Sequence, residues 1–406
     1  MKFGLIVEKE TRNIGDDIQA YANKRFLPTV DYYIDRDHID EFVPDKEEKV
    51  AMIMNGWFLQ YTLNWPPSPY IKPLPVSMHF TSKDWFWDTT DRAYHLQGYG
   101  LDYLKNIEPI GCRDSHTVKV LNDKGIKTEY TGCLTLTIEK FRDVEKQDYI
   151  CAVDVSDEVV EQIKKTTDME VKIITHTVPE DYYKLTWNER MKNVEKLLKT
   201  YQGARAVVSY RLHCALPCLA LETPVILLNE AYRNDRFGDY TKYIESCTEE
   251  EFITGKKQYD YRNIPVHSDD WKKLKNNLIK RCEDFISKCN ENEEIYKDDI
   301  NIRDYKNYVI PKSNWLKEAA IESYKRFENE KKEEENIIIK SQELLDEKNK
   351  VIEEKDKGII RKDEELNYYK KEFEQAVKKI EEYKKENESI KNSRWWKLRN
   401  RIKGEK

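Results

Sequence analysis

The stretch "ARAVVSYRLHCALPCLALETPVILLN", residues 204–229, decides the fold. It opens with the apolar run "AVVS", closes with "TPVILLN", and carries the helix-like segment "CALPCLALE" between them. A buried strand, a short helix and a second buried strand make one unit of a parallel α/β sheet. Arg211 and His213 fall in the turn before the helix, and Pro217 falls in or near its first turn, where a missing amide costs little. We therefore expect a cation and an imidazole at the carboxyl end of a parallel strand.

The same alternation continues on both sides of this stretch. Strands are expected at 2–8, 49–57, 75–80, 108–112, 128–138, 149–155 and 170–178, and helices at 13–26, 115–125, 157–167 and 187–201. The segment 64–75 is rich in proline and is expected to be a loop, and 247–255 is expected to return to the sheet. The pattern predicts two doubly wound, Rossmann-like α/β domains that face each other across a cleft.

Changes in composition divide the chain into five parts. A charged break at 139–147 separates an N-terminal α/β domain, 1–142, from a C-terminal α/β domain, 143–300, which carries the Arg-Leu-His turn. The expected remainder is a connecting helix at 301–327, a charged helical or coiled-coil region at 328–392, and a basic, Trp-containing tail at 393–406.

The charged region repeats an apolar residue every seven positions. The repeated residues are Ile338, Leu345, Ile352, Ile359, Leu366, Phe373 and Ile380. A coiled coil needs a second apolar row three residues further on, and that row is polar until Tyr369. The sequence predicts a long helix, with a coiled coil and a homo-oligomer formed by its second half. A solvated helical tail is the alternative.

The tail "SRWWKLRNRIKGEK", 393–406, mixes tryptophan with basic residues. This mixture suits the interface of an anionic membrane, while a solvated helix end or a contact with another protein are the alternatives. No secretory signal and no apolar stretch of about 20 residues is present. The protein is expected in the cytoplasm, bound peripherally at the inner face of the membrane.

Composition excludes several classes of function. Lys+Arg 70 against Asp+Glu 76 gives a net charge of −6, which argues against a general nucleic-acid binder. The eight cysteines form no CxxC pair and no Cys/His cluster, so neither structural zinc nor disulfides are expected. The GxxxxGK[ST], GxGxxG and GxSxG signatures are absent.

Candidate site residues lie where ligands gather in open α/β sheets, at strand ends beside helix N-termini. Arg211 and His213, together with the following helix, place three sources of positive potential at one point and predict an anion site, against a purely structural turn. In "GCRDSHTV", Arg113 follows a strand and Asp114 can cap the next helix. Two interpretations fit this segment: an oxyanion site, and a structural ion pair between Arg113 and Asp114. His176 lies near the end of another expected strand. It is interpreted either as a site residue or as a hydrogen-bonded structural residue.

The segment "NIGDD" follows the first strand. Gly15 lets the backbone approach a ligand closely, and Asn13 and Asp16 are polar groups at a helix start. Helix capping alone also explains these residues.

Taken together, four segments resemble the polysaccharide pyruvyl transferase family. They are "NIGDDIQAYA", "IGCRDSHTVKVL", "TGCLTLTI" and "VVSYRLHCALPCLALETPVI", and the resemblance covers roughly residues 1–260. The family is similar in fold to two-domain GT-B glycosyltransferases. Its members transfer the enolpyruvyl unit of phosphoenolpyruvate to two hydroxyls of a sugar and form a ketal.

The resemblance implies a role for each candidate. Arg211, Leu212 and His213 would line the donor pocket, with Arg113 contributing from the facing domain. Asn13, Gly15 and Asp16 would line the acceptor side. His213 is the expected general acid, and Asp16 or Asp114 the expected base. Phosphoenolpyruvate is the donor substrate, and the scheme requires no metal and no cofactor.

The leading prediction is a pyruvyl transferase acting on a cell-surface polysaccharide or its lipid-linked precursor. The alternatives are a GT-B glycosyltransferase that uses a nucleotide sugar and a non-catalytic scaffold for polysaccharide assembly. Three positions depart from the family pattern: Tyr210 replaces a common Ser, Glu222 a common Gly, and Cys133-Leu134 a common Asp-Pro. We expect these departures to bear on the acceptor and donor rather than on the fold.

Overall fold

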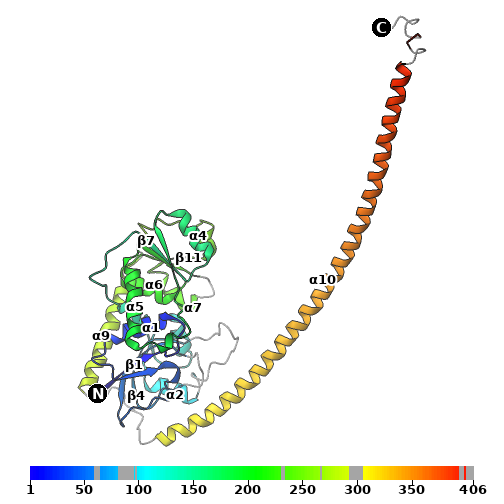
Figure 1. Cartoon of the computed structure of the whole chain (residues 1–406). Coiled ribbons are helices and arrows are strands. Elements are labelled where there is room, and N and C mark those ends of the chain that lie inside the picture. The colour runs from blue at the N-terminus through cyan, green and yellow to red at the C-terminus, as the bar shows by residue number, and fades with distance from the viewer. Residues whose placement is uncertain are drawn as a thin grey trace. The chain divides into compact units, whose positions relative to one another are not determined.

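The computed structural model divides into two units, residues 1–319 and residues 320–406. The structure describes residues 1–58, 65–80, 96, 98–229, 234–265, 268–291, 305–392 and 397–398. The first unit contains all the described strands and the shorter helices (Figure 1). The second unit is the larger part of one long helix.

The first unit contains two parallel sheets. The six-stranded sheet has the order β2-β1-β3-β4-β5-β6 and the five-stranded sheet has the order β11-β10-β9-β7-β8. The strands of the first sheet are β1 (Lys2–Val7), β2 (Tyr32–Asp35), β3 (Val50–Phe58), β4 (Ile71–Phe80), β5 (Ile110–Cys112) and β6 (Thr128–Tyr130). Those of the second are β7 (Tyr149–Val153), β8 (Glu170–Ile174), β9 (Ala206–Ser209), β10 (Val225–Leu228) and β11 (Glu245–Cys247). The predicted α/β class with two Rossmann-like sheets is confirmed.

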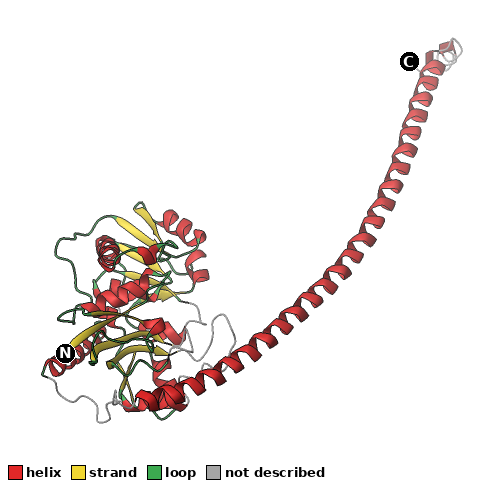
Figure 2. Cartoon of the chain, turned by 60° about the horizontal axis from the view of Figure 1, so that its bottom comes forward, coloured by secondary structure: helices red, strands yellow, loops and turns green. Residues whose placement is uncertain are grey.

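Helices pack on the faces of the two sheets. Those of the first unit are α1 (Ile14–Lys24), α2 (Gly98–Asn106), α3 (Ser115–Asn122), α4 (Asp157–Thr166), α5 (Trp187–Gly203), α6 (Leu212–Ala220), α7 (Asn234–Phe237), α8 (Glu249–Ile253) and α9 (Trp271–Asn290), with short 3-10 turns between them. Helix α10 (Tyr305–Asn392) follows them in the chain and forms most of the second unit. Helices α1, α5 and α6 lie between the two sheets, and α4 lies on the far side of the second (Figure 1). Figure 2 shows the same layers with the strands in yellow.

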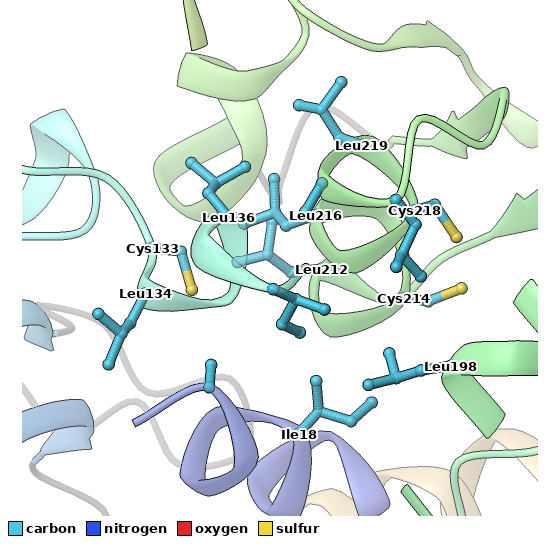
Figure 3. Packing of buried hydrophobic residues seen from close by; sticks show 14 of the residues in the cluster. Ile18, Cys133, Leu134, Leu136, Leu198, Leu212, Cys214, Leu216, Cys218 and Leu219 are labelled. Atoms are coloured by element: carbon cyan, nitrogen blue, oxygen red, sulfur yellow. The ribbon is translucent and has the colours of Figure 1, made fainter. Parts of the chain in front are cut away.

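One hydrophobic core fills the space between the sheets. Along β3, Ala51 and Ile53 belong to this core, while Val50, Met52 and Met54 face the outer helices of the first sheet. Strands buried on both faces need such continuous apolar runs, which is why they are easily found in the sequence. Figure 3 shows the centre of the core, where leucines of α6 lie near Ile18 of α1 and Leu136 of the 3-10 turn Leu134–Thr137.

Helix α9 returns to the first sheet, although it follows the second in the chain. It packs on the 3-10 turn Leu134–Thr137 and on β3 and β4 through an apolar face that includes Leu278, Cys282 and Phe285. The sequence-based boundary assigns all of 143–300 to the second domain, whereas residues 271–290 pack on the first.

Several predicted elements have different bounds in the structure. The proline-rich segment 64–75 is only partly a loop, because β4 already begins at Ile71; Asn64 lies outside the described residues. The strand predicted at 128–138 ends at Tyr130, because Gly132 takes a φ of +74° and turns the chain. Residues 247–255 give the end of β11 and the helix α8.

The opening motif also differs at its centre. Helix α6 begins at Leu212, so His213 lies in its first turn rather than in the preceding turn, and Pro217 lies one turn further along. Because proline has no amide hydrogen, the His213 carbonyl has no donor at that position. Strand β2 was not predicted, since its segment "YYID" is short and half polar.

Helix α10 is one continuous helix from Tyr305 to Asn392, so the segments predicted as 301–327 and 328–392 share it from Tyr305 onward. The tail 393–406 lies outside the described residues, except for Lys397 and Leu398. Within the described part of the chain, no helix combines the length and apolar composition that crossing a bilayer requires.

Candidate anion site between the two sheets

The candidate residues lie at the carboxyl ends of the strands. In the first sheet the direction in which successive strands are added reverses between β1 and β3, and in the second sheet it reverses between β7 and β9. Ligands bind outside the carboxyl ends of the strands at such points. Asn13 follows β1, and Arg211 follows β9. The Ile14 N–H donates to the His176 carbonyl at 2.9 Å, and the Val178 N–H donates to the Arg12 carbonyl at 3.1 Å. These two bonds bring the strand ends of both sheets together.

Arg113 joins the two halves of the site. Arg113 follows β5 of the first sheet. Its Nη1 lies 3.5 Å from Nε2 of His213, which lies in α6, after β9 of the second sheet. Its backbone is fixed by its own N–H donating to Met78 and by the Tyr240 hydroxyl donating to its carbonyl at 2.6 Å. The side chain is fully buried, yet Nε and Nη2 have no hydrogen-bond partner among the described residues. A buried guanidinium with two nitrogens outside any hydrogen bond to the described residues is suited to bind an anion.

His213 lies against the start of α1. A Cβ added to Gly15 would come within 3.2 Å of the His213 Cβ and 3.0 Å of Asn13 Oδ1, so a larger residue would require His213 or Asn13 to shift. Burial, followed by the charges of Arg113 and Arg236, holds the pKa of His213 well below its usual value. The imidazole is therefore neutral in the free protein.

Arg211 is held by a residue that the sequence analysis missed. Its Nε donates to Asp154 Oδ2 at 2.7 Å, and Asp154 also accepts from Thr175 Oγ1 at 2.7 Å and from the His176 N–H at 3.1 Å. Asp154 has a φ of +49°, in the left-handed region that aspartate adopts more easily than most residues. Burial works to raise the pKa of Asp154, but the bonds from Thr175 and His176 and the Arg211 charge lower it overall. Asp154 therefore stays ionised and orients Arg211.

Asp114 does not have the environment of an acceptor-side base. It is fully buried, caps α3 by accepting from the Thr117 N–H at 2.8 Å, and binds His79 Nδ1 at 2.5 Å. Although burial opposes it, His79 and Arg113 together lower the pKa of Asp114 to about 2. The Arg113–Asp114 ion pair is long, with 3.8 Å between Nε and Oδ2. Asp114 therefore positions His79 and Arg113.

His79 should make the free energy of unfolding depend on pH. Burial lowers the pKa of His79 to about 4, from 6.5 in the unfolded chain. Between pH 4 and pH 6.5 the unfolded chain therefore binds a proton at His79 that the folded protein does not bind. Because of this difference, the free energy of unfolding rises with pH over that range. On going from pH 7 to pH 5 we expect the free energy of unfolding to fall by about 2 kcal/mol on account of His79. Urea unfolding of wild type and His79→Gln at both pH values measures this fall.

The matched control for His79 is His38, which is exposed and pairs with Asp35. His38→Gln should not reduce the loss of stability on acidification, because the Asp35 hydrogen bond raises the pKa of His38. If His79→Gln shows the same fall in the free energy of unfolding between pH 7 and pH 5 as wild type, the prediction that His79 is buried in its neutral form is wrong.

Asn13 and Asp16 are largely occupied by local contacts. Asn13 Oδ1 accepts from the Gly15 N–H at 3.0 Å, which caps α1, and Asp16 Oδ2 accepts from Thr11 Oγ1 at 2.8 Å. Asp16 nevertheless lines a small pocket at the ends of β1 and β3, with Arg36 at 3.8 Å. Beside it, burial and the Asp16 charge raise the pKa of Glu8 to about 9.

Four other residues of interest have their contacts elsewhere than with Arg113. Leu212 is 3% exposed and belongs to the core between the sheets, as Figure 3 shows, so its side chain packs rather than binds. His176 is buried, with Nε2 2.7 Å from the Tyr201 hydroxyl. Tyr210 packs against the outer core of the second sheet. Glu222, in the position of the common Gly, has a φ of +54° and pairs with exposed Lys140.

The sequence analysis missed three residues near the site. Two of them could have been found from the sequence, and the third could not. His79 and Asp154 end the predicted strands 75–80 and 149–155, where the strand-end rule applies to them as it does to Arg211. Arg236, on the short helix α7, lies over the Trp57 ring at 5.4 Å and contributes to the field at His213. Its segment has no periodic pattern that would mark it.

The geometry favours binding of a small, multiply charged anion. The charges of Arg113 and Arg236 act on the neutral His213, Arg211 lies two residues before it in the chain, and the first turns of α1 and α6 meet at Gly15 and His213. Among the described residues, no three His, Cys, Asp or Glu side chains group as metal ligands would.

Comparison with known proteins identifies a family. A family model described as polysaccharide pyruvyl transferase matches residues 13–232. No curated protein matches. Among solved structures, the chain is similar to UDP-GlcNAc 2-epimerase of Methanocaldococcus jannaschii in complex with UDP-GlcNAc and UDP, at 12% identity and a TM-score of 0.35, over 68% of this chain and 98% of the other. It is also similar to the wall teichoic acid polymerase TagF, at 10% identity and a TM-score of 0.34, over 79% and 90%.

Proposed function

The chain belongs to the polysaccharide pyruvyl transferase family, a family of transferases, and we propose that it moves the enolpyruvyl unit of phosphoenolpyruvate onto two hydroxyls of a sugar. The acceptor is a cell-surface polysaccharide or its lipid-linked precursor. The observation that carries the proposal is Arg113, a fully buried guanidinium with two nitrogens that make no hydrogen bond to the described residues.

Phosphoenolpyruvate suits this group of cations because it carries both a phosphate and a carboxylate. Arg113 and Arg211 come from different sheets, and guanidinium groups bind both kinds of oxyanion through paired hydrogen bonds. Asp154 already holds Nε of Arg211 at 2.7 Å, so its terminal nitrogens are oriented before the donor arrives. Prior orientation lowers the entropic cost of binding.

The reaction needs one proton delivered and two removed. One sugar hydroxyl adds its oxygen to C2 of the donor and loses its proton, while C3 gains a proton and becomes a methyl group. The second hydroxyl then adds to C2 as the C2–O bond to phosphate breaks, which releases phosphate and leaves the ketal. Arginine side chains stabilise the negative charge on the departing phosphate.

His213 is the proposed proton donor, and the bound donor itself prepares it. In the free protein, burial and the neighbouring cations keep the imidazole neutral. A phosphate and a carboxylate placed beside it oppose the effect of those cations and raise its pKa. His213 would then take up a proton when the donor binds and deliver it to C3. Asp16, with Glu8 beside it, is the proposed base toward the acceptor.

The test is release of inorganic phosphate from phosphoenolpyruvate in the presence of sugar acceptors, with pyruvylated product identified by mass spectrometry. We expect phosphate release to depend on the acceptor and to be lost in Arg211→Ala and His213→Ala. Isothermal calorimetry against phosphoenolpyruvate and a panel of nucleotide sugars provides the second arm. Binding and turnover of a nucleotide sugar, without use of phosphoenolpyruvate, would reject the proposal.

A lipid-linked acceptor places the enzyme at the inner face of the membrane, where the basic tail 393–406 is the proposed contact. Deletion of 393–406 should abolish sedimentation with anionic liposomes and leave neutral liposomes unbound throughout. The proposal predicts that phosphate release with a water-soluble acceptor is unchanged. Equal sedimentation of the full and shortened chains would contradict the membrane role.

A further inference from the structure

The second half of α10 carries an apolar seam on an exposed helix. Every residue from 331 to 392 is exposed. Leu366, Phe373 and Ile380 repeat at a spacing of seven, and their side chains are 52%, 71% and 53% exposed. Tyr369 and Tyr383, with Ala376 between them, form a second row three residues further on. Two rows at this spacing are the contact surface of a coiled coil.

The first half of the helix does not continue this surface. There the second row is occupied by Lys348, Lys355 and Lys362. A lysine row at the contact surface disfavours pairing, because each ammonium would have to leave water. The contact surface is therefore confined to about residues 366–391.

Charges on the two flanks of the seam select the orientation of a partner helix. One flank carries Glu365, Glu372, Lys379 and Glu386, and the other carries Lys370, Val377, Lys384 and Lys391. In a parallel pair, each residue of the first flank faces the residue five positions further along in the partner. That places Glu365 opposite Lys370 and Glu386 opposite Lys391, while Lys379 opposite Lys384 is the one unfavourable pair. An antiparallel pair would place mostly Glu against Glu and Lys against Lys.

Asn387 supplies an independent indication of strand number. It occupies the first row directly after Ile380 and is the polar residue of that row in this part of the helix. An asparagine at a single position of this kind fixes the register and favours two strands, because the two amides can then bond to each other.

We infer that residues 366–391 pair with the same segment of a second copy of this chain as a parallel, two-stranded coiled coil. The complementary flanks belong to one sequence, so a second copy satisfies them without any other partner. The assembly holds two transferase units together. This inference does not depend on the reaction that those units catalyse.

Sedimentation equilibrium of the full chain at micromolar concentration tests the inference. We expect twice the mass of one 48.6 kDa chain. The seam variant Phe373→Glu/Ile380→Glu should sediment as a monomer. The matched control Ile360→Glu/Tyr368→Glu makes the same chemical change off the seam, at residues 59% and 60% exposed, and should remain a dimer. The thermal transition of the first unit shows that all variants are folded.

Charge exchange tests the orientation. Lys370→Glu/Lys391→Glu and Glu365→Lys/Glu386→Lys should each weaken the dimer, and a mixture of the two should form a mixed dimer. A monomeric wild type, or equal loss of the dimer in the seam variant and its control, would overturn the inference. A mixture that stays monomeric would overturn the parallel arrangement.

Discussion

Replacing Arg113 by methionine should abolish transfer and leave the fold as stable as before, or more stable. In the proposed reaction, phosphoenolpyruvate would lose two hydrogen bonds to a charged group, each contributing about 1.5–3 kcal/mol, so kcat/KM for this donor should fall by roughly 10²–10⁴. The fold, by contrast, loses a buried charge whose Nε and Nη2 make no hydrogen bond to the described residues and whose ion pair with Asp114 is long, at 3.8 Å. Methionine fills similar space without that cost. Steady-state phosphate release and urea unfolding measure the two effects.

The two measurements separate a binding role from a structural one. A structural arginine would lose stability and activity together when replaced. An Arg113→Met protein that unfolds several kcal/mol more easily would therefore contradict a guanidinium held ready for an anion. Arg113→Lys is the intermediate case, because it keeps a charge and loses the paired geometry.

Arg190 should behave in the opposite way, although it is also buried. It binds Asp17 with two nitrogens, of which Nε lies 2.9 Å from Oδ2, and it donates to the Glu8 carbonyl at 2.8 Å. Asp17 is 1% exposed in its side chain, and the Tyr182 hydroxyl is its other donor, at 2.8 Å. Arg190→Met leaves an uncompensated buried carboxylate and should lower the free energy of unfolding by about 3–5 kcal/mol.

Two controls accompany this prediction, both followed by urea unfolding. Arg205 pairs with Asp148 at the surface, and Arg205→Met should cost less than about 1 kcal/mol. The double variant Asp17→Asn/Arg190→Met should lose less stability than the sum of the two single variants, since neither charge is then left alone. A cost for Arg190→Met no larger than that for Arg205→Met would show that the buried pair is not what joins α1 to α5.

The sequence identifies the strand ends well because the physical signal there is local. Apolar runs mark β1, β7 and β9, and Arg211 and His213 follow directly from the end of β9. It was less successful where a role depends on distant neighbours. Asp114 looks like an available base until His79, from another strand, is found 2.5 Å away. Leu212 looks like part of a pocket until the packing between the sheets is known.

The family match covers residues 13–232, and Arg236 lies just beyond it. No local pattern could have indicated that Arg236 lies near His213, because that proximity depends on how α7 packs against the end of β3. The same holds for α9, whose return to the first sheet is decided by the match between two apolar surfaces that are distant in sequence.

The core between the sheets also limits how these enzymes can be recombined. The charged break at 139–147 looks like a place to exchange halves between relatives and so combine donor and acceptor preferences. Side chains of both sheets and of α9 interdigitate in that single core, so a foreign half would bring a mismatched surface and cavities with it. New specificity is more accessible through substitutions of partly exposed strand-end residues such as Arg211, which lie outside that core.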